Sequence, residues 1–212
     1  MTAVAHPHLG STPVAEVASP LDLTAIHHPG CAAAIWRRDL RPEFQSWVDA
    51  LQPHQIPTSR TTLRPASARE AVLQICEISG TPECDERSRL IDDVTVMIEL
   101  FADLMSTPFV SLRLEAVNSN ACRKFHIDAV TARLICTYRG AGTQYGVAVD
   151  DQPPTTFASV PTGDPILLRG TRWPENPQSG LRHRSPPIEG TGATRFVMVL
   201  DVAGGLRRGA TP

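Results

Sequence analysis

The sequence lacks the features that would place the protein in a membrane or in an export pathway. No stretch approaches the roughly 18 consecutive apolar residues that indicate a membrane-spanning helix. The first ten residues, MTAVAHPHLG, contain neither the basic nor the apolar region of a secretory signal. We therefore expect a cytoplasmic protein without a membrane partner.

Basic and acidic residues are present in nearly equal numbers. The chain has 20 basic and 22 acidic residues, a formal net charge of −2. Broad binding to nucleic acid needs a concentrated positive surface, so we do not expect it here. With 212 residues, 42% of them hydrophobic, the chain is long enough to bury a core without the help of a metal or a disulfide.

Cysteine is scarce. There are five cysteines, and no two of them form a CxxC pair. An odd number of cysteines in a chain without an export signal argues against a disulfide framework. The lack of CxxC pairs also excludes a zinc ribbon and a thioredoxin-like motif.

The first half of the chain divides into two predicted parts. Residues 1–30 are rich in Pro, Ala, Ser and Thr and show no sustained periodicity, which predicts a flexible N-terminal segment. Residues 31–107 are predicted to form a helical support region, because apolar residues recur there at steps of three and four. Its helices are predicted after Pro42, over residues 66–79 and over residues 85–106, with a Pro- and Thr-rich loop over residues 52–66.

After Pro108 the pattern changes to the alternation of apolar and polar residues that is typical of strands. No helical pattern separates these strand-like runs, so a parallel βαβ sheet is not expected. Residues 108–203 are therefore predicted to be an antiparallel β-module that completes an α+β fold, and residues 204–212 a tail. The strands are predicted at residues 109–117, 133–138, 144–149, 165–168 and 195–202.

Candidate metal ligands lie within the predicted β-module. In the segment FHID, His126 and Asp128 are two residues apart, which on an extended strand places both side chains on the same face. His183 follows three strand-like runs later, and Arg195 lies at the head of the last strand. Two His and one carboxylate on one face of an octahedral ion leave three positions open, as in non-haem Fe(II) oxygenases.

The order HxD, distal His and Arg resembles that of the Fe(II)/2-oxoglutarate-dependent dioxygenases, and their prolyl-hydroxylase-like branch most of all. The segments RLICTYRGAGTQ, VPTGDPILLRG and HRSPPIEGTGATRFVMVLD resemble the surroundings of these residues in that family. The resemblance implies a double-stranded β-helix, a cupin-like jelly roll. It further implies His126, Asp128 and His183 as ligands of Fe(II), and Arg195 as the cation that binds the distal carboxylate of 2-oxoglutarate.

Two further residues are candidates for the same cosubstrate. Arg133 opens the strand after Asp128 and competes with Arg195 for the carboxylate of 2-oxoglutarate. Tyr138 could donate a hydrogen bond to the same ligand, although a tyrosine in a core is at least as common. The substrate stays open, a small molecule or a peptide among the possibilities, and so does the oligomeric state.

The chain as a whole resembles a bacterial family, domain of unknown function 1826, through HHPGCAAAIWRR, FHID and LRHRSP. That resemblance implies a link to zinc-responsive genes and metal-chaperone GTPases. A zinc-binding or metal-homeostasis protein is therefore a second hypothesis, with Cys122 near the β-site and with a possible second metal site at His27, His28 and Cys31. The β-module is also compatible with a cupin-like metalloenzyme without an oxo-acid cosubstrate and with a non-catalytic interaction module.

Overall fold

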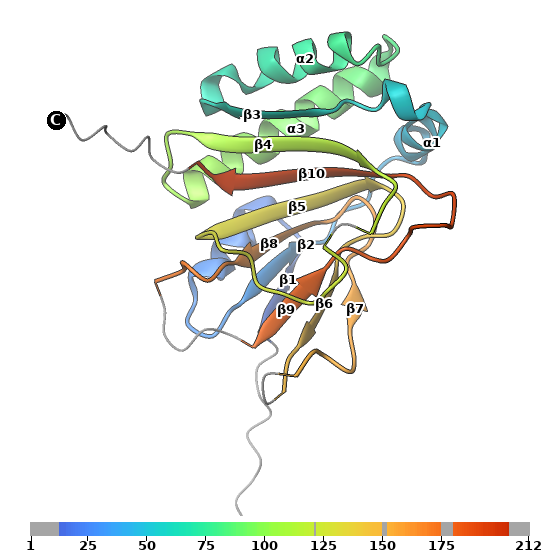
Figure 1. Ribbon diagram of the computed structural model, residues 1–212. Helices are drawn as coiled ribbons and strands as arrows, with labels where there is room; N and C mark the ends of the chain where they lie inside the picture. Colours follow the sequence, from blue (N-terminus) through green and yellow to red (C-terminus); the bar gives the residue numbers. More distant parts are fainter. Residues whose placement is uncertain (1–12, 121, 150–151, 175–179, 204–212) are drawn as a thin grey trace, which may run out of the picture.

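The chain folds into two facing β-sheets, with a layer of helices on the outer face of the larger sheet (Figure 1). The computed structural model describes residues 13–120, 122–149, 152–174 and 180–203. The predicted tail, residues 204–212, lies outside the described residues, as do residues 1–12 of the predicted N-terminal segment.

The large sheet has seven strands. Neighbouring strands are antiparallel except for β1 and β2, which are parallel. The antiparallel pairing predicted after Pro108 is thus confirmed for β4, β5, β8 and β10. In spatial order the strands are β1 (Val14–Val17), β2 (Ala33–Trp36), β8 (Pro165–Arg169), β5 (Ala132–Arg139), β10 (Arg195–Val202), β4 (Val110–Val117) and β3 (Ser59–Leu63).

The small sheet covers the inner face of the large one. Its order is β7 (Ala158–Ser159), β6 (Gln144–Val147) and β9 (Leu181–Arg184), and its pairs are antiparallel. Leu181 and the partly buried Tyr145 pack against Ile135, Val197 and Val199 of the large sheet. A smaller hydrophobic core therefore lies between the two sheets.

The alternation of side chains along β10 separates this smaller core from a larger one. Val197 and Val199 face the small sheet, whereas Met198 and Leu200 belong to the core beneath the helices. Successive residues of a strand point to opposite faces, so both faces of this sheet are buried. A residue on β5 or β10 therefore faces either the space between the sheets or the helical layer, according to its position in the alternation.

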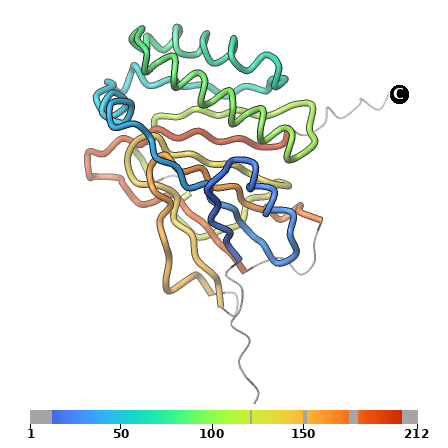
Figure 2. The backbone as a smooth tube through the Cα atoms, turned by 180° about the vertical axis from the view of Figure 1, so that it is seen from behind, coloured from blue at the N-terminus to red at the C-terminus, as the bar shows by residue number. Residues whose placement is uncertain are grey.

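Three α-helices form the outer layer: α1 (Pro42–Ala50), α2 (Ala68–Ile78) and α3 (Asp85–Leu104). Leu90, Val94, Met97 and Phe101 recur every three or four residues on α3 and are almost completely buried. This apolar face covers the large sheet, and Figure 2 shows α3 crossing the sheet from behind. The helices predicted after Pro42 and over residues 66–79 and 85–106 are confirmed. None of the helices in the described ranges is long and apolar enough to cross a membrane.

The region before α2 differs from the prediction in three places. Residues 14–27, predicted to be flexible, form β1 and a 3₁₀ helix, η1 (Pro20–His27), whose Leu23 and Ile26 are buried. Ala33–Trp36 is a strand, and the expected loop contains β3 together with the short helix η2 (Pro53–Gln55). The support region is therefore not purely helical. A third short helix, η3 (Pro65–Ser67), leads into α2.

The local sequence accounts for these differences. β1 and β3 are the two edges of the large sheet. β1 has only four residues, VAEV, and β3, SRTTL, is mostly polar, as edge strands often are, so neither shows a sustained alternation of apolar and polar residues. β2 lies between β1 and β8 and is buried on both faces, so its sequence AAIW is a continuous apolar run instead of an alternating one.

Candidate metal centre

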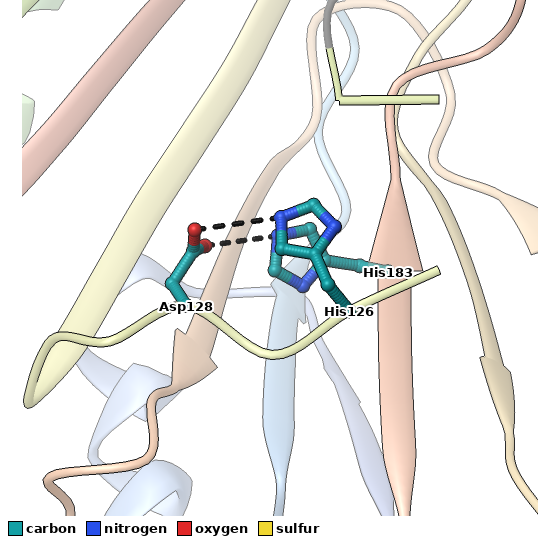
Figure 3. A group of neighbouring side chains, drawn as sticks. All are labelled: His126, Asp128 and His183. Atoms are coloured by element: carbon teal, nitrogen blue, oxygen red, sulfur yellow. Dashed lines mark ion pairs between the residues drawn. The ribbon is translucent and has the colours of Figure 1, made fainter. Parts of the chain in front are cut away.

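The three predicted metal ligands come together between the two sheets. His126, Asp128 and His183 each offer one ligating atom, and these atoms lie within 4.8 Å of one another (Figure 3). Asp128 Oδ1 is 3.5 Å from His126 Nε2, and Asp128 Oδ2 is 3.0 Å from His183 Nε2. Figure 3 shows the carboxylate on one side and the two imidazoles next to each other on the other side, with their ring planes tilted by 46°. Among the described residues, no other group of three His, Cys, Asp or Glu side chains is arranged in this way.

The two histidines are placed by β9 and by a single bridge to it. His183 points inward on β9, on the same face as Leu181, and only 6% of its surface is exposed. The backbone N–H groups of His126 and His183 each donate to the other's carbonyl over 3.0 Å. FHID was expected on an extended strand, but His126 makes only this isolated bridge. The bridge is enough to hold the two imidazoles 4.6 Å apart.

Asp128 lies in the loop between this bridge and β5, and the loop is held from the side. The backbone N–H of Thr171 donates to the Asp128 carbonyl over 2.9 Å. A Cβ on Gly170 would lie 2.0 Å from the carbonyl oxygen of Val130 and 2.8 Å from that of Asp128. The close approach of the two segments therefore requires glycine at position 170.

Contacts behind the ligands orient two of them. His126 Nδ1 lies 2.8 Å from the backbone carbonyl oxygen of Lys124. A carbonyl only accepts, so Nδ1 carries the hydrogen and Nε2 of the neutral ring offers its lone pair to the site. On the other side, Arg133 Nη1 donates to Asp128 Oδ1 over 2.6 Å.

The electrostatics of the cluster favour a bound cation. Burial alone would raise the pKa of Asp128, but the two imidazoles and the Arg133 guanidinium hold that pKa well below its usual range. The contact with Asp128 raises the pKa of His126, although burial opposes this. Asp128 Oδ2 is buried and accepts no hydrogen bond, since its contact with His183 lacks hydrogen-bond geometry. Arg133 pairs with Oδ1 of this ionised carboxylate, so the buried Oδ2, 3.0 Å from His183 Nε2, is the oxygen that a bound cation would satisfy.

This donor set fits the two-His, one-carboxylate site of non-haem Fe(II) oxygenases. The zinc hypothesis expects a closed site with a sulfur ligand. Cys122 lines the neighbouring cavity but is not part of the three-residue group. Cys136, also near FHID in the sequence, lies on the opposite face of β5, where burial raises the pKa of its thiol to about 12. In the described part of the chain, no thiol therefore completes the cluster.

A cavity of about 90 Å³ joins the two histidines to Arg195. Arg195 is 2% exposed, and its Nε donates to the Ala141 carbonyl over 2.6 Å. No carboxylate among the described residues pairs with it, and burial lowers its pKa to about 10. A buried guanidinium that lines a cavity and has no carboxylate partner in the described ranges has the chemistry to bind an anion. Besides these residues, the lining includes Arg113, Glu115, Val117, Cys122, Arg133, Ile135, Thr143, Arg184, Ser185, Val197 and Val199.

Two threonines near Arg195 were missed from the sequence. Arg195 Nη2 donates to Thr137 Oγ1 over 3.2 Å, and Thr143 lines the same cavity; both threonines are nearly fully buried. The available signal was the alternation on β5, because Thr137 shares a face with Arg133 and Ile135. Thr143 follows a turn, and no local pattern identified it.

The structure corrects the prediction for Tyr138 and shows Arg133 paired with two carboxylates. Tyr138 lies on the helical face of β5, where its hydroxyl donates to Asp93 Oδ2 over 2.7 Å, so it does not reach the cavity. The reason is that one step along a strand reverses the side-chain direction. Arg133 does line the cavity, but Asp128 and Asp201 already accept its hydrogen bonds, so it is not the free cation of the site.

The HHxxC cluster does not assemble as a metal site in the described ranges. His27 Nε2 lies 3.1 Å from the Leu104 carbonyl oxygen at the end of α3, and its ring packs against Trp173. The Cys31 thiol donates to the Ala33 carbonyl over 3.2 Å, and His28 is exposed. These contacts attach η1 to α3 and to the sheet.

Comparison with known proteins identifies the fold and the family. The structure is similar to that of dioxygenase for auxin oxidation 1 from Arabidopsis thaliana in complex with 2-oxoglutarate, with a TM-score of 0.56 and 10% identity over 92% of this chain and 94% of that one. It is also similar to the rice dioxygenase for auxin oxidation, with a TM-score of 0.51 and 12% identity over 91% and 83% of the two chains. The chain therefore shares the fold of these two dioxygenases.

No curated protein matches the sequence. A family model does match, over residues 18–201, and its description is protein of unknown function, DUF1826. Because this match covers most of the chain, the protein belongs to the DUF1826 family.

Proposed function

We propose that the protein is a mononuclear non-haem Fe(II) oxygenase that uses 2-oxoglutarate, built on a double-stranded β-helix. The observation that carries this proposal is the shared cavity. It is lined by the two imidazoles, beside which lies a buried carboxylate oxygen that lacks a hydrogen bond, and by a buried arginine without a carboxylate partner among the described residues. A metal cation and a small dicarboxylate would complete both sites at once.

Each residue has a definite part in this proposal. His126, Asp128 and His183 would hold Fe(II) by one face and leave the opposite face for ligands. Arg195, supported by Thr137, would bind the distal carboxylate of the oxo-acid with its fork of N–H groups. When bound, Fe(II) and 2-oxoglutarate supply oxygen activation coupled to decarboxylation of the oxo-acid.

The walls of the cavity support the same chemistry. Ile135, Val197 and Val199 line it and belong to the smaller core between the sheets. Apolar side chains at these positions exclude water and strengthen the attraction between Arg195 and a carboxylate. A volume of about 90 Å³ is far below the roughly 300–1,000 Å³ of sites for drug-sized ligands, so it suits a small organic acid.

Anaerobic titration with Fe(II), with and without 2-oxoglutarate, tests the proposal. We expect one Fe(II) per chain and, after addition of 2-oxoglutarate, a charge-transfer band in the visible spectrum. His126→Ala should abolish both, with an unchanged far-UV circular dichroism spectrum. Arg195→Gln should retain Fe(II) but weaken 2-oxoglutarate binding at least tenfold. Metal binding that survives in His126→Ala would refute the metal site, and unaltered oxo-acid binding in Arg195→Gln would refute the role of the arginine.

A further inference from the structure

Behind the candidate metal centre lies a chain of three charged side chains from three different segments. The Arg133 guanidinium donates through Nε and Nη2 to the two oxygens of Asp201, over 2.7 Å each. Its remaining nitrogen, Nη1, donates to Asp128 Oδ1 over 2.6 Å. All three side chains are mostly buried, with 17%, 21% and 12% of the surfaces of Arg133, Asp201 and Asp128 exposed.

The sheet holds the Arg133–Asp201 ion pair in place. Arg133 on β5 and Asp201 on β10 are direct partners in the antiparallel register. Their side chains therefore leave the same face of neighbouring strands and meet as a two-bond fork. Asp128, in contrast, lies in a loop outside any strand, so the sheet does not orient its side chain directly.

The two oxygens of Asp128 are consequently unequal. Oδ1 accepts a charge-assisted hydrogen bond from Arg133 and lies 3.5 Å from His126 Nε2, whereas Oδ2 accepts no hydrogen bond and lies closer to an imidazole, 3.0 Å from His183 Nε2. An oxygen engaged by a guanidinium is a poorer metal ligand than one that is free. We propose that Arg133, held by Asp201, is a positioning residue that makes Asp128 bind the metal through Oδ2 alone; this rests on the metal centre of the proposed function.

The consequence concerns the number of open positions at the metal. A carboxylate that binds through one oxygen takes one position, and with two imidazoles it leaves three of six. A carboxylate that binds through both oxygens takes two and leaves only two. The Arg133–Asp201 pair would thus preserve all three open positions, of which a chelating cosubstrate needs two and one further ligand needs the third.

The test has to separate geometry from charge, because removal of Arg133 alone would leave two carboxylates beside the cation. The double variant Arg133→Gln/Asp201→Asn removes one charge of each sign and keeps the net charge of the cluster. The matched control is Arg38→Gln/Asp93→Asn. It removes another mostly buried ion pair with two hydrogen bonds, and it lies outside the cavity and makes no hydrogen bond to Asp128.

Co(II) alone is the probe, added to the full-length protein and followed by its visible absorption. We expect the first double variant to bind Co(II) roughly 10–100-fold more weakly than the wild type and to show an altered band shape. The control should stay within about threefold of the wild type and keep its spectrum. As a rescue, Arg133→Lys with native Asp201 should recover part of the affinity, since it restores a donor to Asp128.

The outcomes distinguish the positioning role from the proposed function. Wild-type affinity and an unaltered Co(II) spectrum in Arg133→Gln/Asp201→Asn would overturn the positioning role and leave the metal centre intact. Failure of the wild-type protein to bind Co(II) or Fe(II) would overturn the metal centre and the positioning role together. Because the readout is metal binding, lack of a response to 2-oxoglutarate would count only against the proposed cosubstrate.

Discussion

At the scale of single residues, two arginines on the inner face of the large sheet have opposite environments. Arg133 donates to two carboxylates, whereas Arg195 donates only to neutral oxygens, those of Ala141 and Thr137. Burial of a cation without an anion costs free energy, and this cost lowers the pKa of Arg195 to about 10. The cost is fully present below that pH and diminishes as the pH rises toward 12.5, the ordinary value.

This environment predicts opposite effects of Arg195→Met on stability and on binding. Methionine fills much of the same space without a charge, so the free energy of unfolding of the ligand-free protein should rise by about 1–3 kcal/mol. Calorimetry at pH 7 should show this as an increase in Tm of roughly 2–4 °C per kcal/mol. Affinity for 2-oxoglutarate should be lost in the same variant. A fall in Tm would indicate that the hydrogen bonds of Arg195 outweigh the cost of burying its charge.

At the scale of elements, the alternation along β5 divides neighbouring residues between two tasks. Thr137 lies on the same face of β5 as Arg133 and accepts a hydrogen bond from Arg195, while Tyr138 donates to Asp93 of α3 beneath the helices. Which face of β5 lies toward the candidate site depends on where the small sheet and the helices pack, and the sequence of β5 does not show this.

Because adjacent residues of β5 point to opposite faces of the sheet, substitutions of Thr137 and Tyr138 should affect different properties, ligand binding and stability respectively. Thr137→Val removes the hydroxyl that accepts from Arg195 and should weaken 2-oxoglutarate binding about three- to tenfold, the equivalent of one hydrogen bond. Tyr138→Phe removes one donor to Asp93, which keeps the two hydrogen bonds from Arg38, and should lower the free energy of unfolding by about 0.5–1.5 kcal/mol, with 2-oxoglutarate affinity unchanged. Denaturant titration and equilibrium binding on both variants measure the two effects. Loss of 2-oxoglutarate affinity in Tyr138→Phe, with loss of stability alone in Thr137→Val, would contradict this assignment of the two faces.

At the scale of the whole molecule, the candidate metal site connects parts of the chain that are distant in sequence. His126 and Asp128 precede β5, His183 lies on β9, and Arg195 opens β10. A metal ion bound there links the loop before β5 to the small sheet and is absent from the unfolded chain. Binding must therefore stabilise the native state by mass action.

We expect Fe(II) or Co(II) to raise the Tm of the wild-type protein. At a metal concentration 100 times the Kd, the stabilisation is about 2.7 kcal/mol, which for a chain of this length corresponds to roughly 5–10 °C. Differential scanning calorimetry under nitrogen measures the shift. The variant His183→Ala serves as the control and should show no shift. An equal shift in that variant would place the bound metal elsewhere.

Much of the fold could be predicted because local pattern and tertiary environment agree there. The helical face of α3 and the alternating strand β4 each bury a regular set of apolar residues, which leaves a periodic record in the sequence, and β5 and β10 contain apolar runs because both of their faces are buried. The strands β1 and β3 left no such record, because β1 has only four residues and β3 is an edge strand rich in polar residues.

The sequence by itself determined the residue types that can hold a metal and their order along the chain, because ligand chemistry is a property of single side chains. Three further properties follow only from the folded chain: Asp128 leaves one oxygen without a hydrogen bond, Thr137 and not Tyr138 accepts from Arg195, and Arg195 lacks a carboxylate partner in the described chain. These properties depend on which segments meet across two sheets. Hydrogen bonds and ion pairs between residues that are distant in the sequence leave no periodic pattern, unlike the burial of one face of a helix or strand.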